Sequence, residues 1–145
     1  MPAQRIRAAL ATVLDGLPVT GSRVYRSRST AMEEANLPGI RLATREEESE
    51  NLTLITPALQ ENKVRVIVEC CGKTSDDLDD LLDQMAKEVE NRISLNQTLG
   101  GMTRYIQLQS TEIGLRNEAE KPIGVCSLVY EALYLASEDA PDVSL

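Results

Sequence analysis

The C-terminal half of the chain has the pattern of one long amphipathic helix followed by two long strands, and this order limits the fold most. Apolar residues recur at helical spacing between Asp76 and Ile93, namely Leu78, Leu81, Leu82, Met85, Val89 and Ile93. Thr74 or Ser75 is expected to cap this helix, with aspartates in its first turns. Strands are predicted over residues 103–115 and 122–136, joined by a polar turn over residues 116–121. The pattern favours an α+β fold.

The N-terminal half supplies a second helix and a long hairpin. Apolar residues at helical spacing predict a helix over residues 3–14, and Gly16 and Pro18 end it. Alternating apolar residues from Val64 to Cys71 give the clearest strand, and residues 39–71 are predicted to form one hairpin. The expected fold is therefore a mostly antiparallel sheet of four to five strands with two main helices packed on it. We expect one domain over residues 1–136, with a hairpin protruding at about residues 45–62 and a flexible tail at residues 137–145.

Composition argues against several classes of function. The chain has 145 residues and a net charge of −8, which disfavours binding to nucleic acid backbones or anionic membranes. It has no histidine, the commonest general base and metal ligand, and no phenylalanine or tryptophan to line a ligand pocket. We therefore expect no enzyme activity, no metal and no cofactor. The three cysteines and the polar N-terminus predict a protein of a reducing compartment, without a signal peptide or membrane span.

Three short motifs suggest chemistry, but each has a simpler structural interpretation. Aspartates over residues 76–80 suggest a cation site, yet they lack the pattern of a calcium loop and suit a helix start. Cys70 and Cys71 suggest redox activity, although neighbours in a strand point to opposite faces and Cys126 could meet one of them across the sheet. The sequence from Gly72 to Thr74 resembles the end of a phosphate-binding loop, but the position of its first glycine holds Ile67.

Two segments have the composition of interaction surfaces. The first is a basic patch of three arginines around Tyr25, which either faces solvent or meets an acidic partner: Arg23, Arg26 and Arg28. The second is the hairpin tip, where a charged run precedes several aliphatic residues: Arg45, Glu46, Glu47, Glu48, Leu52, Leu54, Ile55 and Leu59. A hairpin tip with this much aliphatic surface either docks on a partner or folds back on its own core.

The order of these elements resembles the tail terminator proteins of long-tailed bacteriophages, the family of the lambda-type minor tail protein U. The resemblance rests on the Arg5-Ile-Arg-Ala-Ala-Leu helix, the Gly21-Ser-Arg-Val-Tyr segment and the Leu37-Pro-Gly-Ile-Arg-Leu strand entry. It continues through Val64-Arg-Val-Ile-Val-Glu, Asp77-Leu-Asp-Asp-Leu-Leu and Glu120-Lys-Pro-Ile-Gly-Val-Cys-Ser-Leu-Val-Tyr-Glu. It covers nearly the whole chain up to Ala136, as a pattern of elements without a catalytic signature.

The resemblance implies a structural role in virion assembly. Six copies would form a ring on the head-proximal end of the tail tube, stop its polymerisation and offer a surface for head attachment. The implied partners are further copies of the chain, the major tail tube protein and the head-completion or connector protein, with DNA only passing through the lumen. The protein would belong to the virion tail and, during assembly, to the host cytoplasm. The alternatives are a head–tail connector or tail completion protein and, more remotely, a small cytosolic ligand-binding module or enzyme.

Overall fold

The computed structural model describes residues 2–26, 32, 34–54, 56–118 and 121–137. The protein has two main helices, α1 (Pro2–Leu14) and α2 (Leu78–Ser94), and a short 3-10 helix, η1 (Glu34–Asn36). Its strands are β1 (Val24–Tyr25), β2 (Gly39–Asn51), β3 (Leu59–Lys73), β4 (Tyr105–Glu118) and β5 (Lys121–Ser137). The strands form one sheet in the order β1-β2-β3-β5-β4. Among these strands, β1 pairs in parallel with β2, and the other pairs are antiparallel. The predicted α+β class, with a mostly antiparallel sheet and two main helices, is confirmed.

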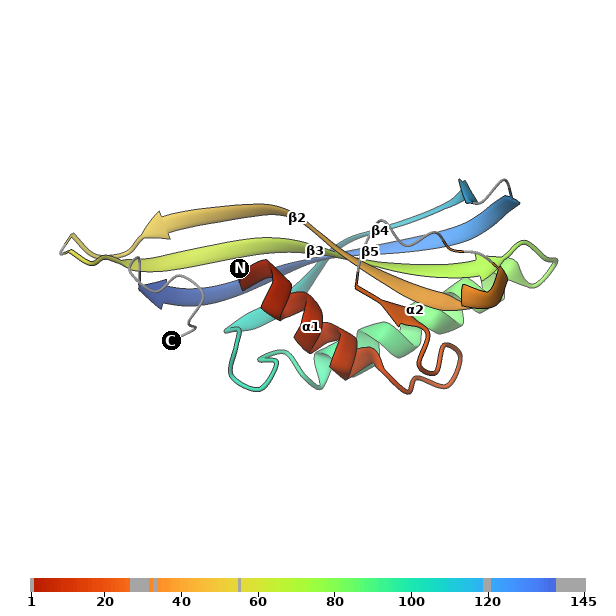
Figure 1. Ribbon diagram of the computed structural model, residues 1–145, viewed down its shortest axis with the longest axis horizontal. Coiled ribbons are helices and arrows are strands. Elements are labelled where there is room, and N and C mark those ends of the chain that lie inside the picture. Colours follow the sequence, from red (N-terminus) through yellow and green to blue (C-terminus); the bar gives the residue numbers. More distant parts are fainter. Residues whose placement is uncertain (1, 27–31, 33, 55, 119–120, 138–145) are drawn as a thin grey trace.

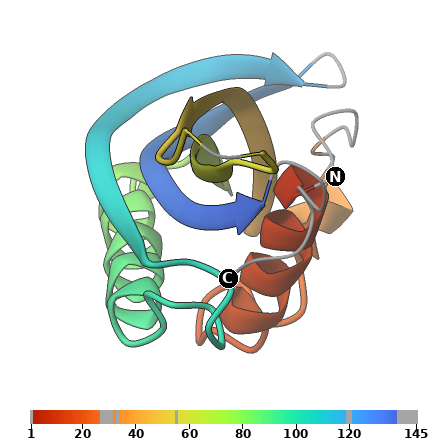
Figure 2. The same ribbon diagram turned by 90° about the vertical axis from the view of Figure 1, so that its left-hand side faces the viewer.

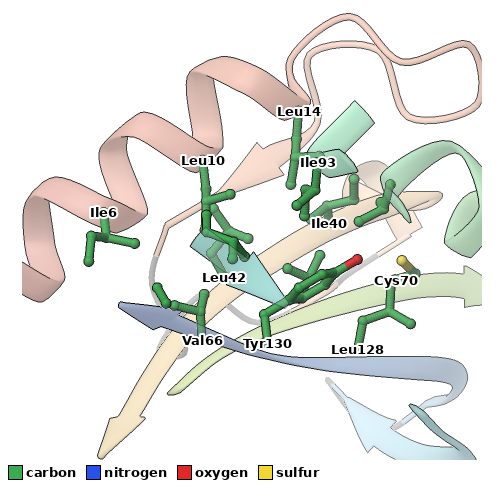
Figure 3. Packing of buried hydrophobic residues seen from close by; sticks show 14 of the residues in the cluster. Ile6, Leu10, Leu14, Ile40, Leu42, Val66, Cys70, Ile93, Leu128 and Tyr130 are labelled. Carbon is green, nitrogen blue, oxygen red and sulfur yellow. The ribbon is translucent and has the colours of Figure 1, made fainter. Parts of the chain in front are cut away.

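Both helices pack on the same face of the sheet, where they bury the main core (Figures 1 and 2). Ile6, Leu10 and Leu14 line the buried side of α1, with Leu10 over Leu42 of the sheet and Leu14 beside Ile93 of α2 (Figure 3). From α2, the buried side chains are Leu78, Leu82, Met85, Val89 and Ile93, which recur at helical spacing. This core is aliphatic apart from two tyrosines, as expected for a chain without phenylalanine or tryptophan.

Two side chains of α2 form hydrogen bonds with the end of α1 and the loop that follows it. Arg92 Nη1 donates to the carbonyl oxygen of Val13 at 2.9 Å. Glu88 Oε1 accepts from the backbone N–H of Val19 at 3.1 Å. These bonds satisfy backbone groups that neither helix can pair by itself, and they fix the two helices side by side.

The start of α2 differs from the prediction. The residue that caps the helix is Asp77, without a side-chain capping bond, so neither Thr74 nor Ser75 is the cap. Thr74 Oγ1 instead donates to the carbonyl oxygen of Pro122 at 2.9 Å, which ties the loop to β5. Gly72 and Gly124 lie opposite each other below this turn, and their missing side chains make room for Leu78 and Leu81. The close approach of the helix to two glycines therefore sets where α2 begins.

Both strands of the C-terminal pair are longer than predicted. β4 continues to Glu118 and β5 begins at Lys121, so the turn predicted over residues 116–121 is wrong for four residues, which lie in strands: Arg116, Asn117, Glu118 and Lys121. Arg116 stays in the strand because its guanidinium is held by Glu69 and Ser127. β5 also includes Ser137, the first residue of the predicted tail, and the rest of that tail lies outside the described residues. The sheet curls strongly, with β4 arching around β5 (Figure 2).

Candidate interaction surfaces

The tip of the β2–β3 hairpin lies beyond both helices, at the left end of the molecule in Figure 1. Its turn is closed by two bonds: Leu52 N–H donates to the Leu59 carbonyl at 2.7 Å, and Leu59 N–H donates to Thr53 Oγ1 at 2.9 Å. Leu54 is fully exposed and Leu52 about half exposed, whereas Leu59 is half-buried. Ile55, predicted to belong to the same surface, lies outside the described residues. The tip thus presents two leucines to solvent on a well-bonded turn.

The charged run predicted at this hairpin forms the outer half of β2. Arg45, Glu47 and Glu48 are exposed; Glu46 lies in the same strand, and its side chain is outside the described part. A register shift between Thr44 and Glu47 interrupts the pairing with β3, and such a shift bends a strand. Beyond it, the hydroxyl of Tyr134 on β5 donates to Glu47 Oε1 across β3. The outer half of β2 is therefore anchored to β5 while most of its carboxylates face solvent.

The arginines predicted as a basic patch do not share one role. Arg23 donates from Nε to the Pro38 carbonyl at 2.7 Å and from Nη2 to the Val19 carbonyl at 3.0 Å, so it fastens the chain around β1. Arg26 is exposed, and Arg28 lies outside the described residues. Since β1 pairs with β2 at Ile40 and Arg41, this region is about 35 Å along the strand from the hairpin tip. The two surfaces predicted from sequence are therefore separate.

A further exposed apolar surface lies on β4, and the sequence pattern did not predict it. Leu108, Ile113 and Leu115 are all exposed, and a register shift between Leu108 and Ser110 brings them to the same face of the sheet. This is the face that carries the helices, because Leu108 lies opposite Tyr130 and Ile113 opposite Cys126. In a regular strand, Leu108 would point to the opposite face from Ile113 and Leu115, because even and odd positions alternate between faces. A prediction from regular alternation therefore does not place the three residues on one surface.

The opposite face of the sheet carries a buried carboxylate between two arginines. Glu69 is 2 % exposed and accepts from Arg41 Nε at 3.2 Å and from Arg116 Nη1. Arg116 Nη2 also donates to Ser127 Oγ at 3.4 Å. Arg41, Glu69 and Ser127 are direct cross-strand partners on β2, β3 and β5. Because the Glu69 carboxylate is paired with arginines from two other strands, it links β3 to β2 and β4.

The cysteines have the properties of core residues. Cys70, Cys71 and Cys126 are free thiols and all are buried. Cys70 and Cys126 lie directly opposite each other on β3 and β5, as one of the sequence hypotheses allowed. Burial raises the pKa of the Cys70 thiol well above its ordinary value, with the nearby Cys126 contributing less. Thiols held in the protonated form are poor nucleophiles and poor metal ligands.

The described residues offer little else for chemistry. Across them, no cluster of three or more histidine, cysteine, aspartate or glutamate side chains could hold a metal ion. Asp76, Asp77, Asp79 and Asp80 are exposed around the start of α2. A shallow hollow of about 540 Å³ runs along α2, lined by polar residues that include Gln84, Glu88 and Asn91. Within the described part, neither helix is long and apolar enough to cross a membrane.

No protein-family model matches the chain, and a search of curated proteins found no significant match.

Proposed function

We propose that this protein is a tail terminator of a long-tailed bacteriophage, a structural protein and not an enzyme. In this role about six copies form a ring on the head-proximal end of the tail tube, stop tube polymerisation and provide the surface for head attachment. The observation that carries the proposal is the β2–β3 hairpin, which extends beyond the helical layer and ends in exposed Leu52 and Leu54. Apolar side chains in such a position are typical of surfaces that become buried on assembly.

The shape of the subunit suits a closed ring. In a ring, one patch of each copy meets a different patch on the next copy. A long hairpin at one end of an elongated sheet supplies one such patch, away from the surfaces of the helices (Figure 1). The net charge of −8 agrees with a ring through which DNA passes without binding, because acidic surfaces repel phosphate.

The proposal is tested by imaging the purified protein with tail tubes assembled from the major tail tube protein. The expected result is one ring at one end of each tube, with tubes of defined length when the protein is present during polymerisation. Decoration along the tube wall, or no binding, would reject termination. Binding to a head connector without any effect on tube length would instead favour the connector role.

A second measurement monitors self-assembly of the protein in the absence of tail tubes. Light scattering over a range of protein concentrations should show small species passing to a ring of about six copies. A fixed monomer or dimer at every concentration, also in the presence of tubes, would contradict a ring.

A further inference from the structure

Strand β4 forms one edge of the sheet and has no partner on its outer side within the described residues. It pairs only with β5, over its whole length from Tyr105 to Glu118. An edge of this length presents a row of unpaired backbone N–H and C=O groups, and proteins usually cover or interrupt such edges. The register shift near Leu108 interrupts the first part of β4, but the pairing with β5 is regular from Ser110 onward. The second half of β4 is therefore a regular strand edge.

The exposed apolar residues of this half-strand are not covered by the helices. Ile113 is 59 % exposed and Leu115 is 66 % exposed, both on the face that carries the helices. The buried residues of α2 pack over β3 and β5, one strand short of β4. Two large aliphatic side chains beside an open strand edge make a surface that another strand can cover.

Gly114, between these residues, has no role that the fold of one copy requires. A side chain built at this position meets nothing within 4 Å, and its backbone is not in the left-handed region that favours glycine. Glycine weakens a strand, and in strands it often marks a place where another backbone approaches closely. The open space around a Cβ at Gly114 leaves room for an approaching chain.

We propose that β4 pairs edge to edge with β4 of a second copy, in antiparallel orientation, about a two-fold axis at Gly114. Residues equally distant from Gly114 then face each other. Ile113 of each copy lies opposite Leu115 of the other, which covers the exposed apolar pair. Glu112 of each copy lies opposite Arg116 of the other, so opposite charges meet on both sides of the axis.

Charge disfavours the two nearest alternative axes at residues that lie on the same face of β4 as Gly114. An axis at Glu112 would place two glutamates opposite each other, and an axis at Arg116 would place two arginines opposite each other. Like charges directly opposite are destabilising in a sheet. Arg116 keeps its contact with Glu69 in this arrangement, because a guanidinium has five N–H donors and the contacts with Glu69 and Ser127 use Nη1 and Nη2.

The resulting dimer leaves the hairpin tips free. Gly114 pairs with Val125, which pairs with Cys71 at the end of β3 opposite to the β2–β3 tip. This end of β4 lies at the right of Figure 1. A two-fold axis there keeps all helices on one side of a continuous sheet and points the two tips in opposite directions. The pairing does not rest on the proposed role in the tail, since it concerns the free protein in solution.

The first experiment uses a cysteine at the axis. In Gly114→Cys, the two introduced thiols face each other at a distance that a disulfide spans. The native cysteines are buried, so diamide should oxidise the introduced pair and give a covalent dimer on a non-reducing gel. Ser110→Cys is the matched control, because it is equally exposed on the same strand but about 26 Å from its counterpart.

The expected result is fast and complete dimer formation by Gly114→Cys and little by Ser110→Cys. Equal rates for the two variants would overturn the proposed axis, and so would the absence of a covalent dimer from Gly114→Cys. The tail-tube assay is not involved, so failure here leaves the proposed function intact, and success here does not depend on it.

The second experiment measures association of the unmodified chain by sedimentation velocity between about 5 and 200 µM. The wild type should pass from monomer to dimer at concentrations below those at which larger rings form. Ile113→Lys should raise the dissociation constant by about tenfold or more, because a lysine replaces an apolar side chain covered in the dimer. Leu95→Lys, at a leucine that is 74 % exposed at the end of α2, should leave it unchanged. A wild type that stays monomeric throughout, or equal effects of the two lysines, would reject the proposal.

Discussion

Arg116 on β4 donates a hydrogen bond to Glu69 on β3, although strand β5 lies between their two strands. The contact passes over β5, and Arg41 on β2 holds the other oxygen of the same carboxylate. One buried side chain therefore connects β2, β3 and β4. This arrangement matches the strong curl of the sheet, which brings β4 back toward the strands at its centre (Figure 2).

Replacing Glu69 should be far more costly than replacing Arg116. Glu69→Gln keeps the shape but removes the carboxylate charge beside the buried Arg41, and this should lower the free energy of unfolding by about 3 kcal/mol. Arg116→Ala should cost only about 1 kcal/mol, because the side chain is partly exposed and water can replace it. Urea denaturation of the three proteins measures the difference. Equal losses would mean that the exposed arginine, and not burial of the charge, determines the stability of this cluster.

Gly124 should tolerate no side chain while Leu78 is present. A Cβ at this position would lie 2.6 Å from both Cδ atoms of Leu78 and 2.9 Å from its Cγ, so the Leu78 side chain, or α2 with it, would have to move. Gly124→Ala should therefore lower the free energy of unfolding by about 2 kcal/mol. In the background of Leu78→Ala the same change should cost much less, and a double-mutant cycle measures the coupling. Purely additive losses would show that the helix does not press on this glycine.

The sequence was sufficient for the elements whose side chains follow one period. The spacing of Ile6, Leu10 and Leu14 predicts α1, and the alternation from Val64 to Cys71 predicts β3, because each pattern reflects burial of one face. Features that depend on residues far apart in the sequence could not be predicted in this way. The register shift near Leu108 has no glycine or proline signal in the sequence, and it is visible only in the pairing of β4 with β5.

The same distinction applies to the candidate surfaces. The exposure of Leu54 was one of the two outcomes that the sequence allowed, because an aliphatic residue in a polar hairpin tip has few neighbours along the chain. The Arg116 contact was not, because an arginine near a run of polar residues has the composition of a turn. Its partner, Glu69, is 47 residues away in the sequence and meets it only after the sheet has curled.

Alkaline pH should destabilise the fold through two tyrosines. Burial raises the pKa of the Tyr130 hydroxyl far above its ordinary value, and the charge of Glu90 adds to the effect. Burial also raises the pKa of Tyr134, with further contributions from its hydrogen bond to Glu47 and from the charge of Glu47. Because the folded pKa values are raised, this stability is fully present below the ordinary tyrosine value of about 10 and is lost as the pH rises above it.

Urea denaturation between about pH 8 and pH 11 measures this loss. Tyr134→Phe should cost about 1 kcal/mol at pH 8, where it removes the hydrogen bond to Glu47, and should weaken the dependence on pH. A variant that is less stable by the same amount at every pH would show that Tyr134 ionises as readily in the folded chain as in the unfolded one.

The three cysteines should be inert in the folded protein. All are buried, and burial raises the pKa of the Cys70 and Cys126 thiols. The reagent DTNB should therefore react with almost none of them in buffer at pH 8 and with all three in denaturant. Fast reaction of one thiol in buffer would show that part of the sheet around β3 and β5 opens in the native state.

Acidic residues at the hairpin tip should separate folding from assembly. In the variant with Leu52→Asp and Leu54→Asp, two exposed leucines are replaced, so its free energy of unfolding should stay within about 0.5 kcal/mol of the wild type. Ring formation and binding to tube ends should be lost, because the charges would have to be buried in the contact. Leu95→Asp is the control, since this leucine is exposed directly after α2, away from the tip, and its replacement should preserve both folding and assembly. Rings of normal size from the double variant would place the assembly contact elsewhere, and unfolding of that variant would show that the tip contributes to the core.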